Sequence, residues 1–335
     1  MADKKSVNPI KLIFYLVAWY ALNVQYNLYN KKILNVFPYP ASCSLVQLGA
    51  GMFYVFPQWI LGIAGRKFPS KVAVGTLIVV SCCHGAGHFA TVISLGAGSV
   101  AFANVVKAAE PLFSVLMGVI FAGSFPSMGE GFSLLPIIAG VMIASMAEPE
   151  FSQTAFVFAM LSNVLFAARG TFAKKMMTSD VSGADGFAIS TFLSFVVMAP
   201  VAFYMEADTV VKAWEALPSA DTTVDWMALL NGELSDKTVP SQYYFAAYNL
   251  VCGLYYYTYN EMAFMVLDIL DPVGQAVGNT VKRVVIIIAG TIVFNKPLTQ
   301  NGIIGSSVAI GGVLLYSIMK SSAGKKPAAK AKASQ

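Results

Sequence analysis

The sequence predicts an all-helical polytopic membrane protein, and three observations indicate that fold class. Of the 335 residues, 57% are apolar and 12% are charged, with a mean hydropathy of +0.66, whereas soluble domains carry about 25% charged residues. The chain divides into ten runs of roughly 20 residues, the length that crosses a hydrocarbon core of about 30 Å. Lys and Arg residues between the runs, such as Arg66, Lys67, Lys174 and Lys175, gather on the side that holds both termini. Both termini are therefore expected to face a cytosol-like compartment.

The limits of the apolar runs define the predicted segments. The ten spans cover residues 11–34, 43–64, 72–95, 99–122, 130–147, 153–173, 186–205, 241–264, 272–294 and 301–319. The N-terminal segment 1–10 has neither the apolar region of a signal peptide nor an Arg- and Ser-rich transit peptide, so we expect either a mature form or insertion directed by the first helix. A long polar loop is expected at 206–240 and a basic disordered tail at 321–335.

The cysteines lie inside the apolar runs, without paired spacing across loops. They are Cys43, Cys82, Cys83 and Cys252. Small buried hydrophobic residues explain this placement better than disulfides or metal ligands do.

Cations near the middle of two spans need an explanation. Lys282 and Arg283 are adjacent in the ninth span, and Lys107 lies deep in the fourth. A central Lys or Arg costs about 2.5–3.5 kcal/mol on translocon-type scales, and adjacent like charges repel. We expect these residues to face a wet cavity or an anionic ligand. For Lys107, a structural pair with Glu110 at i, i+3 is the alternative.

The fourth and ninth spans also carry an internal repeat. The motif NVVK at 104–107 matches NTVK at 279–282, and IAGVMIAS at 138–145 matches IGGVLLYS at 310–317. The offsets, 175 and 172 residues, are close to half of the chain. Five spans per half is an odd number, so the second half enters the membrane from the opposite side. The sequence therefore predicts two inverted five-helix repeats, 11–150 and 151–320, with a substrate site near the midplane between them.

Histidines and a threonine share one face of the third span. His84, His88 and Thr91 follow one another at i, i+4 and i+7. A metal site would lack a carboxylate or thiolate partner at ligand spacing. The other interpretations are hydrogen bonds that pack helices together and a polar wall of a cavity, which the neighbouring Gly85 and Gly87 favour.

Polar residues in later spans leave similar alternatives. Arg169 lies about a turn and a half from the end of the sixth span, where we expect it to reach the interface or bind a carbonyl group. Tyr256 and Tyr259 belong either to an interfacial aromatic belt or to a pocket that receives their hydroxyl groups.

The sequence contains no Walker loop, nucleophile elbow, HExxH motif or spaced thiols. It therefore predicts neither an enzyme nor an ATP-driven pump, and no cofactor. The net charge of +5 is no indication of nucleic-acid binding, because the position of the charges matters more than their sum. What remains is a carrier in which Lys107, Lys282 and Arg283 form one buried anion site. Arg supplies planar bidentate hydrogen bonds and Lys a point charge, which suit phosphate oxygens.

Several segments resemble one family over nearly all ten spans. They are HGAGHFATVISLG, VVKAAEPLFSV, ARGTFAKKM, YYYTYNE and VGNTVKRVVIIIAGTIVFNKPLT. These segments are similar to the plastidic phosphate translocators (triose-phosphate/phosphate translocator-like) of the drug/metabolite transporter superfamily. The resemblance implies a strict antiporter that exchanges inorganic phosphate for a phosphorylated C3, C5 or C6 compound by alternating access.

The resemblance also implies which residues bind the substrate. Phosphate contacts are expected from Thr91, Lys107, Lys282 and Arg283. His88 and Tyr259 are expected near the organic part, with Phe166 as a wall of the pocket.

Departures from the family pattern bear on the substrate. His88 is similar to the triose- and hexose-phosphate branches, whereas Leu95 stands where the triose-phosphate branch usually has Phe, and Tyr257 and Glu261 replace a His and a Gln. The expected substrate is triose phosphate or 3-phosphoglycerate. The alternatives are a hexose-phosphate or phosphoenolpyruvate antiporter of this family, a nucleotide-sugar or drug exporter of the same fold, and a non-transporting scaffold or channel. The expected location is the plastid envelope or an outer membrane of a complex plastid.

Overall fold

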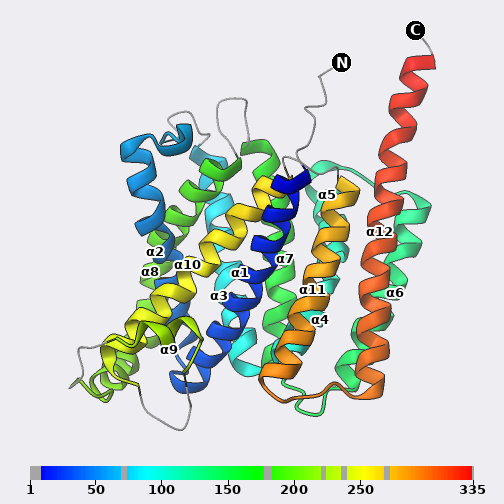
Figure 1. Ribbon diagram of the computed structural model, residues 1–335. Coiled ribbons are helices and arrows are strands. Elements are labelled where there is room, and N and C mark those ends of the chain that lie inside the picture. The colour runs from blue at the N-terminus through cyan, green and yellow to red at the C-terminus, as the bar shows by residue number, and fades with distance from the viewer. Residues whose placement is uncertain are drawn as a thin grey trace.

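The computed structural model describes residues 9–68, 74–176, 183–219, 224–234, 240–267 and 272–333, so most of the N-terminal segment 1–10 and parts of the 206–240 loop lie outside the described residues. Within these ranges every regular element is a helix. The helices are α1 (Pro9–Val36), α2 (Pro40–Leu61), η1 (Ile63–Gly65), α3 (Val74–Ala97), α4 (Val100–Val106), η2 (Lys107–Ala109), α5 (Glu110–Ala122), α6 (Met128–Met146), α7 (Gln153–Met176), α8 (Gly183–Glu215), α9 (Trp226–Leu230), α10 (Gln242–Leu267), α11 (Pro272–Val293) and α12 (Gln300–Ala333). The long helices stand side by side, and α1 begins at the end of the bundle where α12 ends (Figure 1). We call this the terminal end and the opposite one the far end.

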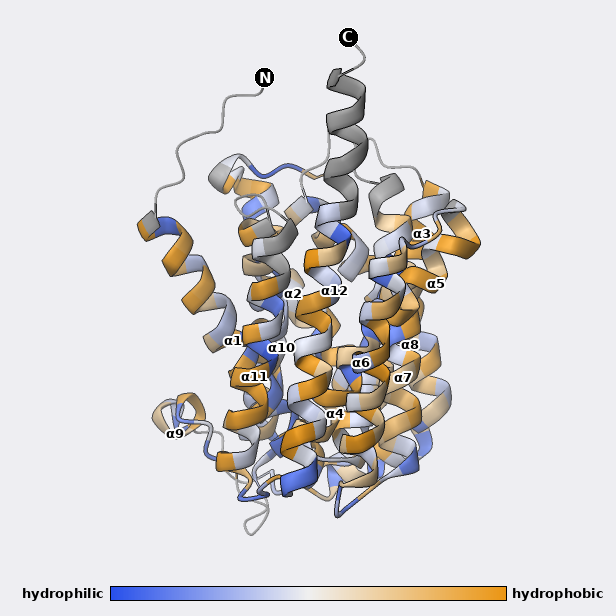
Figure 2. Cartoon of the chain, turned by 90° about the vertical axis from the view of Figure 1, so that its right-hand side faces the viewer, coloured by the Kyte–Doolittle hydropathy of each residue, from blue (hydrophilic) through white to orange (hydrophobic). Residues whose placement is uncertain are grey.

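The helices are those of a multi-pass membrane protein. Among the described residues, six are long and apolar enough to cross a membrane: Val74–Ala97, Val100–Phe121, Met128–Met146, Gln153–Ala173, Gly183–Glu215 and Gln300–Ser322. Apolar residues extend along the helices, and hydrophilic residues gather at the ends and inside the bundle (Figure 2). Helices α1, α2 and α11 are less hydropathic, because they carry polar residues such as Asn23, Gln47 and Lys282. These side chains lie inside the bundle and not on its outer surface.

The predicted span at 99–122 is interrupted at Lys107. The α-helix α4 tightens into the 3₁₀ turn η2 and resumes as α5. Pro111 has no N–H to donate to the carbonyl of Lys107, and the N–H of Glu110 bonds that carbonyl instead. The interruption therefore occurs at the mid-span lysine that the sequence singled out.

Two predicted boundaries are wrong. The segment 206–240 is not a loop throughout, because α8 continues to Glu215 and Glu206 accepts hydrogen bonds from the N–H groups of Ala41 and Ser42 at the start of α2. The segment 321–335 is not a disordered tail throughout, because α12 continues to Ala333. Its Ala and Lys residues are strong helix formers.

Helices α6 and α12 cross closely and run in opposite directions. A Cβ atom on Gly140 would overlap the backbone N of Ala309, and one on Gly312 would lie 2.8 Å from the backbone N of Ile137. Only glycine allows backbones to approach this closely. The hydroxyl of Thr299, just before α12, donates to the carbonyl of Ala147, just after α6, at 3.0 Å.

The far end is closed by bonds between side chains and carbonyl groups. The Nζ atom of Lys31 donates to the carbonyl groups of Leu95 and Gly96 at 2.9 and 3.2 Å, which ties the end of α1 to that of α3. Lys32 donates to the carbonyl of Gly232, in the turn after α9, at 2.6 Å. A substrate path at this end would have to break such contacts.

Candidate anion-binding pocket

A cavity of about 440 Å³ lies inside the bundle. Residues of α1, α3, α4, η2, α5, α7, α10, α11 and α12 line it. At the far end it stops at Leu95 and Ile286, which are 1% and 2% exposed. At the terminal end its lining includes the exposed Lys320. The cavity therefore opens toward the terminal end.

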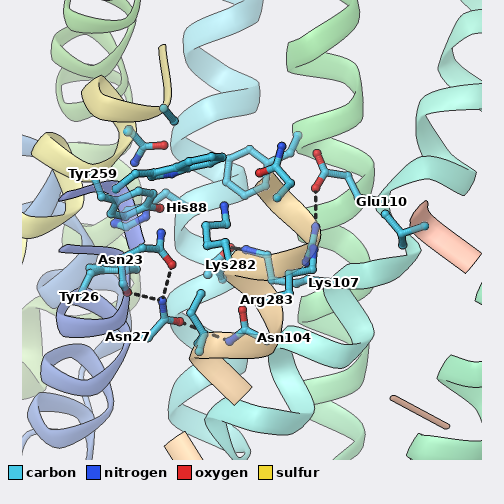
Figure 3. A pocket seen from close by; sticks show the side chains of 18 of the residues that line it. Asn23, Tyr26, Asn27, His88, Asn104, Lys107, Glu110, Tyr259, Lys282 and Arg283 are labelled. Atoms are coloured by element: carbon cyan, nitrogen blue, oxygen red, sulfur yellow. Dashed lines mark hydrogen bonds and ion pairs between the residues drawn. The ribbon is translucent and has the colours of Figure 1, made fainter. Parts of the chain in front are cut away.

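The structure brings all of the predicted site residues to this one cavity. The lining includes Thr91, His88, Lys107, Phe166, Tyr259, Lys282 and Arg283. Figure 3 shows the side chains of Lys107 and Lys282, from opposite halves of the sequence, directed into the same space.

Neutral groups hold Lys107. Its Nζ atom donates to Thr91 Oγ1 at 3.0 Å and lies 5.1 Å from the centroid of the Phe166 ring. The Thr91 hydroxyl in turn donates to the carbonyl of Gly87 at 2.9 Å, which fixes its orientation. Gly87 packs beside Phe166, where a Cβ atom would lie 3.1 Å from the ring. The alternative interpretation of Lys107, a structural pair with Glu110, does not describe the bonded contacts, because Glu110 bonds Arg283 and Lys107 bonds Thr91.

The adjacent cations of α11 have different partners. The ammonium of Lys282 lies 4.9 Å from the centroid of the Trp19 ring on α1. Arg283 Nη2 donates to Glu110 Oε2 at 3.1 Å (Figure 3). Lys282 therefore rests on an aromatic face, whereas Arg283 forms an ion pair.

An aromatic cluster lines the wall beside these cations. The His88 ring lies 4.0 Å, between centroids, from Tyr256, and Tyr26 lies 5.5 Å from Tyr259. His88 is 1% exposed, and its Nε2 atom has no hydrogen-bond partner among the described residues. A buried ring nitrogen without a partner is available to a ligand.

His84 differs from His88 in that its ring nitrogens have partners. Arg169 Nη1 lies 2.9 Å from His84 Nδ1, and the Tyr256 hydroxyl lies 3.1 Å from His84 Nε2. The sequence leaves two interpretations open for this helix face. His84 makes hydrogen bonds that pack helices together, and His88 forms part of the cavity wall. The expectation that Arg169 reaches the interface or a carbonyl group is wrong. Arg169 lines the cavity instead, because His84 and the ring of Phe166 hold it inside.

Asparagines form a polar layer at the far end of the cavity. Asn27 Nδ2 donates to the carbonyl of Asn23 at 2.8 Å, and Asn104 Nδ2 lies 3.4 Å from Asn27 Oδ1 (Figure 3). They are 4–7% exposed. Their hydrogen bonds join α1 to α4, the helix that leads into Lys107.

Sequence reasoning missed several contributors to the pocket, among them Trp19, Glu110 as the partner of Arg283, and Arg169. Trp19 lies in an apolar run without any distinguishing signal. For Glu110, the inverted repeat was a usable signal, since it brings the fourth and ninth spans together.

A cation-lined cavity between helices of a multi-pass bundle is typical of a membrane transporter rather than an enzyme. The chain belongs to the Triose-phosphate Transporter family, whose model matches residues 10–317. This match confirms the resemblance found in the sequence.

Relatives in the family include proteins named for different substrates. The chain is 33% identical over 321 residues to glucose-6-phosphate/phosphate translocator 2, chloroplastic, of Arabidopsis thaliana, covering 96% of this chain and 78% of the relative. It is 34% identical over 318 residues to phosphoenolpyruvate/phosphate translocator 2, chloroplastic, of the same plant, with coverage of 94% and 78%. It is 35% identical over 308 residues to triose phosphate/phosphate translocator, chloroplastic, of Zea mays, with coverage of 92% and 70%.

A crystal structure of a protein with 13% sequence identity has a similar fold. It matches with a TM-score of 0.52 and covers 91% of this chain and 98% of its own. At this identity the likeness concerns the fold alone.

Proposed function

We propose that this protein is a strict antiporter that exchanges inorganic phosphate for a phosphorylated C3 compound, triose phosphate or 3-phosphoglycerate. The observation that carries the proposal is the cavity lined by Lys107 together with Lys282 and Arg283. Basic groups at this depth are costly unless an anion visits them. The three relatives described above are each named as phosphate translocators, which supports phosphate as the shared substrate.

The proposed architecture is ten transmembrane helices arranged as two inverted five-helix repeats, residues 11–150 and 151–320. The crossing of α6 and α12 supports it. Gly140 faces Ala309, and Gly312 faces Ile137. At the repeat offset of 172 residues, Gly140 corresponds to Gly312 and Ile137 corresponds to Ala309. The two contacts are therefore related by the repeat. Because α6 and α12 are antiparallel, the implied two-fold axis lies in the membrane plane, as inverted repeats require.

In this proposal the phosphate group is held by Thr91, Lys107, Lys282 and Arg283. Arg283 uses one of its five N–H donors for Glu110, so others are free to bind phosphate oxygens. The two ammonium groups leave their aromatic neighbours to approach the anion. This rearrangement costs little, because a cation–aromatic contact is worth about 0.5–2 kcal/mol.

His88, Tyr259 and Phe166 surround the organic part of the substrate. The unpartnered Nε2 atom of His88 supports a hydrogen bond to a substrate oxygen. Phe166 contributes an aromatic wall, with Lys107 and Arg169 each 5.1 Å from the centroid of its ring.

Strict exchange follows from the excess of cations. Closing the empty site removes water from unbalanced charge, at a cost of several kcal/mol. A bound phosphate dianion offsets that cost, so the protein changes its opening from one side to the other only when it is loaded.

The proposed location is the plastid envelope or an outer membrane of a complex plastid, with both termini on the cytosol-like side. The chloroplastic names of the relatives support a plastid membrane. In this orientation the cavity opens toward the cytosol-like compartment.

Exchange in proteoliposomes tests the function. Vesicles preloaded with phosphate are expected to take up labelled phosphate, while phosphate-free vesicles are not. Equal uptake in both would refute strict exchange. Competition by dihydroxyacetone phosphate, 3-phosphoglycerate, phosphoenolpyruvate and glucose 6-phosphate measures the preference, and a stronger effect of glucose 6-phosphate or phosphoenolpyruvate would replace the C3 assignment with that substrate. Nucleoside monophosphates are expected not to compete.

A further inference from the structure

The ion pair between Arg283 and Glu110 places a carboxylate inside a cavity that otherwise collects cations. The pair joins α11 to the start of α5 with an Nη2 to Oε2 distance of 3.1 Å. The Arg283 side chain is 14% exposed and that of Glu110 is 39% exposed, so the carboxylate faces the cavity. Among the described residues that line the cavity, Glu110 is the one acid.

Cations outnumber the single acid around the proposed phosphate position. Lys107 and Lys282 rest on neutral groups, the hydroxyl of Thr91 and the ring of Trp19. Among the described residues that line the cavity, Arg283 is the cation that forms an ion pair with Glu110. With Arg169 and Lys320, the described lining holds five cations and one carboxylate, so Glu110 is the group that lowers the positive charge of the cavity.

The pair is built from positions that the internal repeat does not duplicate. At the repeat offset of 175 residues, Val285 matches Glu110 and Ala108 matches Arg283. Each half therefore supplies one member of an ion pair that crosses between the halves. The repeat duplicates the lysines but not this pair. A substitution at Glu110 therefore changes the charge of the site without changing either repeated lysine.

We propose that Glu110 sets the preference of the pocket among anions of different charge, because its carboxylate lowers the positive charge beside the phosphate position. The inference rests on the proposed function, because it requires phosphate to bind beside Arg283. Removing the carboxylate raises the positive charge of the pocket by one, which favours a compound that carries a carboxylate in addition to its phosphate. Arg169, 5.1 Å from the centroid of the Phe166 ring and held by His84, is the same in both cases.

The ion pair also has an ordinary structural interpretation as a link between α5 and α11. A structural link would affect the exchange of all anions alike. A charge-setting role instead changes the ratio between anions of different charge. The ratio is therefore the measurement that separates the two.

The test compares exchange of inorganic phosphate with exchange of phosphoenolpyruvate in proteoliposomes at about pH 8, where phosphate groups carry two negative charges. In Glu110→Gln the ratio is expected to move about tenfold toward phosphoenolpyruvate, the order of magnitude of one charge acting across a partly hydrated protein cavity. Glu110→Asp keeps the charge and is expected to retain nearly the wild-type ratio. The matched control is Glu215→Gln, which removes an exposed carboxylate at the end of α8.

A second variant keeps the test decisive if Glu110→Gln does not assemble. Ser114 lines the cavity one turn beyond Glu110. Ser114→Asp, in an otherwise unchanged chain, is expected to move the ratio in the opposite direction, and in the Glu110→Gln background to restore it. An unchanged ratio in Glu110→Gln overturns the inference. If Glu110→Gln is not obtained, an unchanged ratio in Ser114→Asp overturns it. So does a Glu110→Asp shift as large as that of Glu110→Gln. If the wild type does not exchange phosphate at all, the proposed function itself has failed.

Discussion

The pocket and a second ionic cluster near the terminal end use the same residue types for opposite purposes. In the second cluster Arg66 Nε lies 3.0 Å from Asp185 Oδ1, and Arg66 Nη1 forms an ion pair with Glu261. Trp59 Nε1 donates to Asp185 at 3.0 Å. Two carboxylates surround one guanidinium, and Arg66 and Glu261 are 9% and 1% exposed. The described lining of the pocket instead has five cations, one carboxylate and space for a guest.

The difference indicates how buried charge serves stability or binding. In the Arg66 cluster, opposite charges meet directly and join the end of η1 to α8 and α10. In the pocket, Lys107 and Lys282 rest on neutral groups, so their attraction is available to an anion. Breaking the Arg66 cluster should therefore damage the fold, whereas removing a pocket cation should damage binding alone.

The largest expected effect is that of Arg66→Gln on stability. It leaves the buried carboxylate of Glu261 and the partly buried one of Asp185 without their guanidinium, and breaking a buried pair costs about 3–5 kcal/mol. Unfolding of the purified protein, followed by circular dichroism, measures the loss. Lys67→Gln, at the exposed neighbouring position, is the control. Unfolding of Arg66→Gln at the wild-type temperature would show that the cluster is not structural.

Next in size is the effect of Lys107→Gln or Lys282→Gln on exchange. Each removes a charged donor to phosphate, so phosphate exchange should fall at least about 100-fold, the equivalent of about 2.7 kcal/mol. The unfolding temperature without phosphate should stay the same or rise, because repulsion among the cations decreases. If either variant keeps wild-type exchange, that lysine does not bind the substrate. A loss of stability as large as that of Arg66→Gln would instead remove the contrast between the pocket and the Arg66 cluster.

A smaller effect is expected at Trp19. The proposed binding mode requires Lys282 to leave the Trp19 ring when phosphate binds, so the tryptophan emission should change during a phosphate titration. Trp19→Phe should abolish most of that change and alter phosphate affinity by less than about tenfold. Trp226→Phe, on the exposed α9, should retain it. The same change in Trp19→Phe as in the wild type would place the responding tryptophan elsewhere.

The smallest effect is expected for Glu150, which forms an ion pair with Lys296 at the far end. The hydrogen bond and the charge of Lys296 hold the pKa of Glu150 below its usual value. A lowered pKa stabilises the folded state above the ordinary glutamate pKa, and this contribution is lost as the pH falls through the lowered value. Because both side chains are exposed, solvent and salt screen the pair. Glu150→Gln should leave the unfolding temperature unchanged at neutral pH in physiological salt, and a clear decrease would assign this pair a role in closing the far end.

Much of the architecture and the site is readable from the sequence. Apolar runs predict the spans, and the cost of mid-span cations singles out Lys107, Lys282 and Arg283. The partners of these residues are harder to predict, because they come from distant segments. Glu110 is three residues from Lys107, yet it bonds Arg283, 173 residues away. In the sequence Arg66 lies in a basic segment beside Lys67, whereas in the structure it bonds Glu261, 195 residues away.

The helix ends that were mispredicted have a similar cause. Hydropathy marks where a helix leaves the membrane, but not where it ends. Helix α8 continues past residue 205, where the predicted span ends. Glu206, just beyond that point, accepts hydrogen bonds from the N–H groups at the start of α2, a contact that forms only in the folded structure. The 3₁₀ turn at Lys107 had a local signal in Pro111, since proline removes one hydrogen bond of the helix.

The most direct measurement is an anomalous difference map from crystals soaked with tungstate, a tetrahedral dianion that resembles phosphate. We expect one peak in the cavity, within hydrogen-bonding distance of the Nζ atoms of both Lys107 and Lys282 and of the Arg283 guanidinium, and none beside Arg66. A peak that contacts only one of the two lysines, or a cavity without any peak, would contradict the claim that both halves of the protein build one anion site.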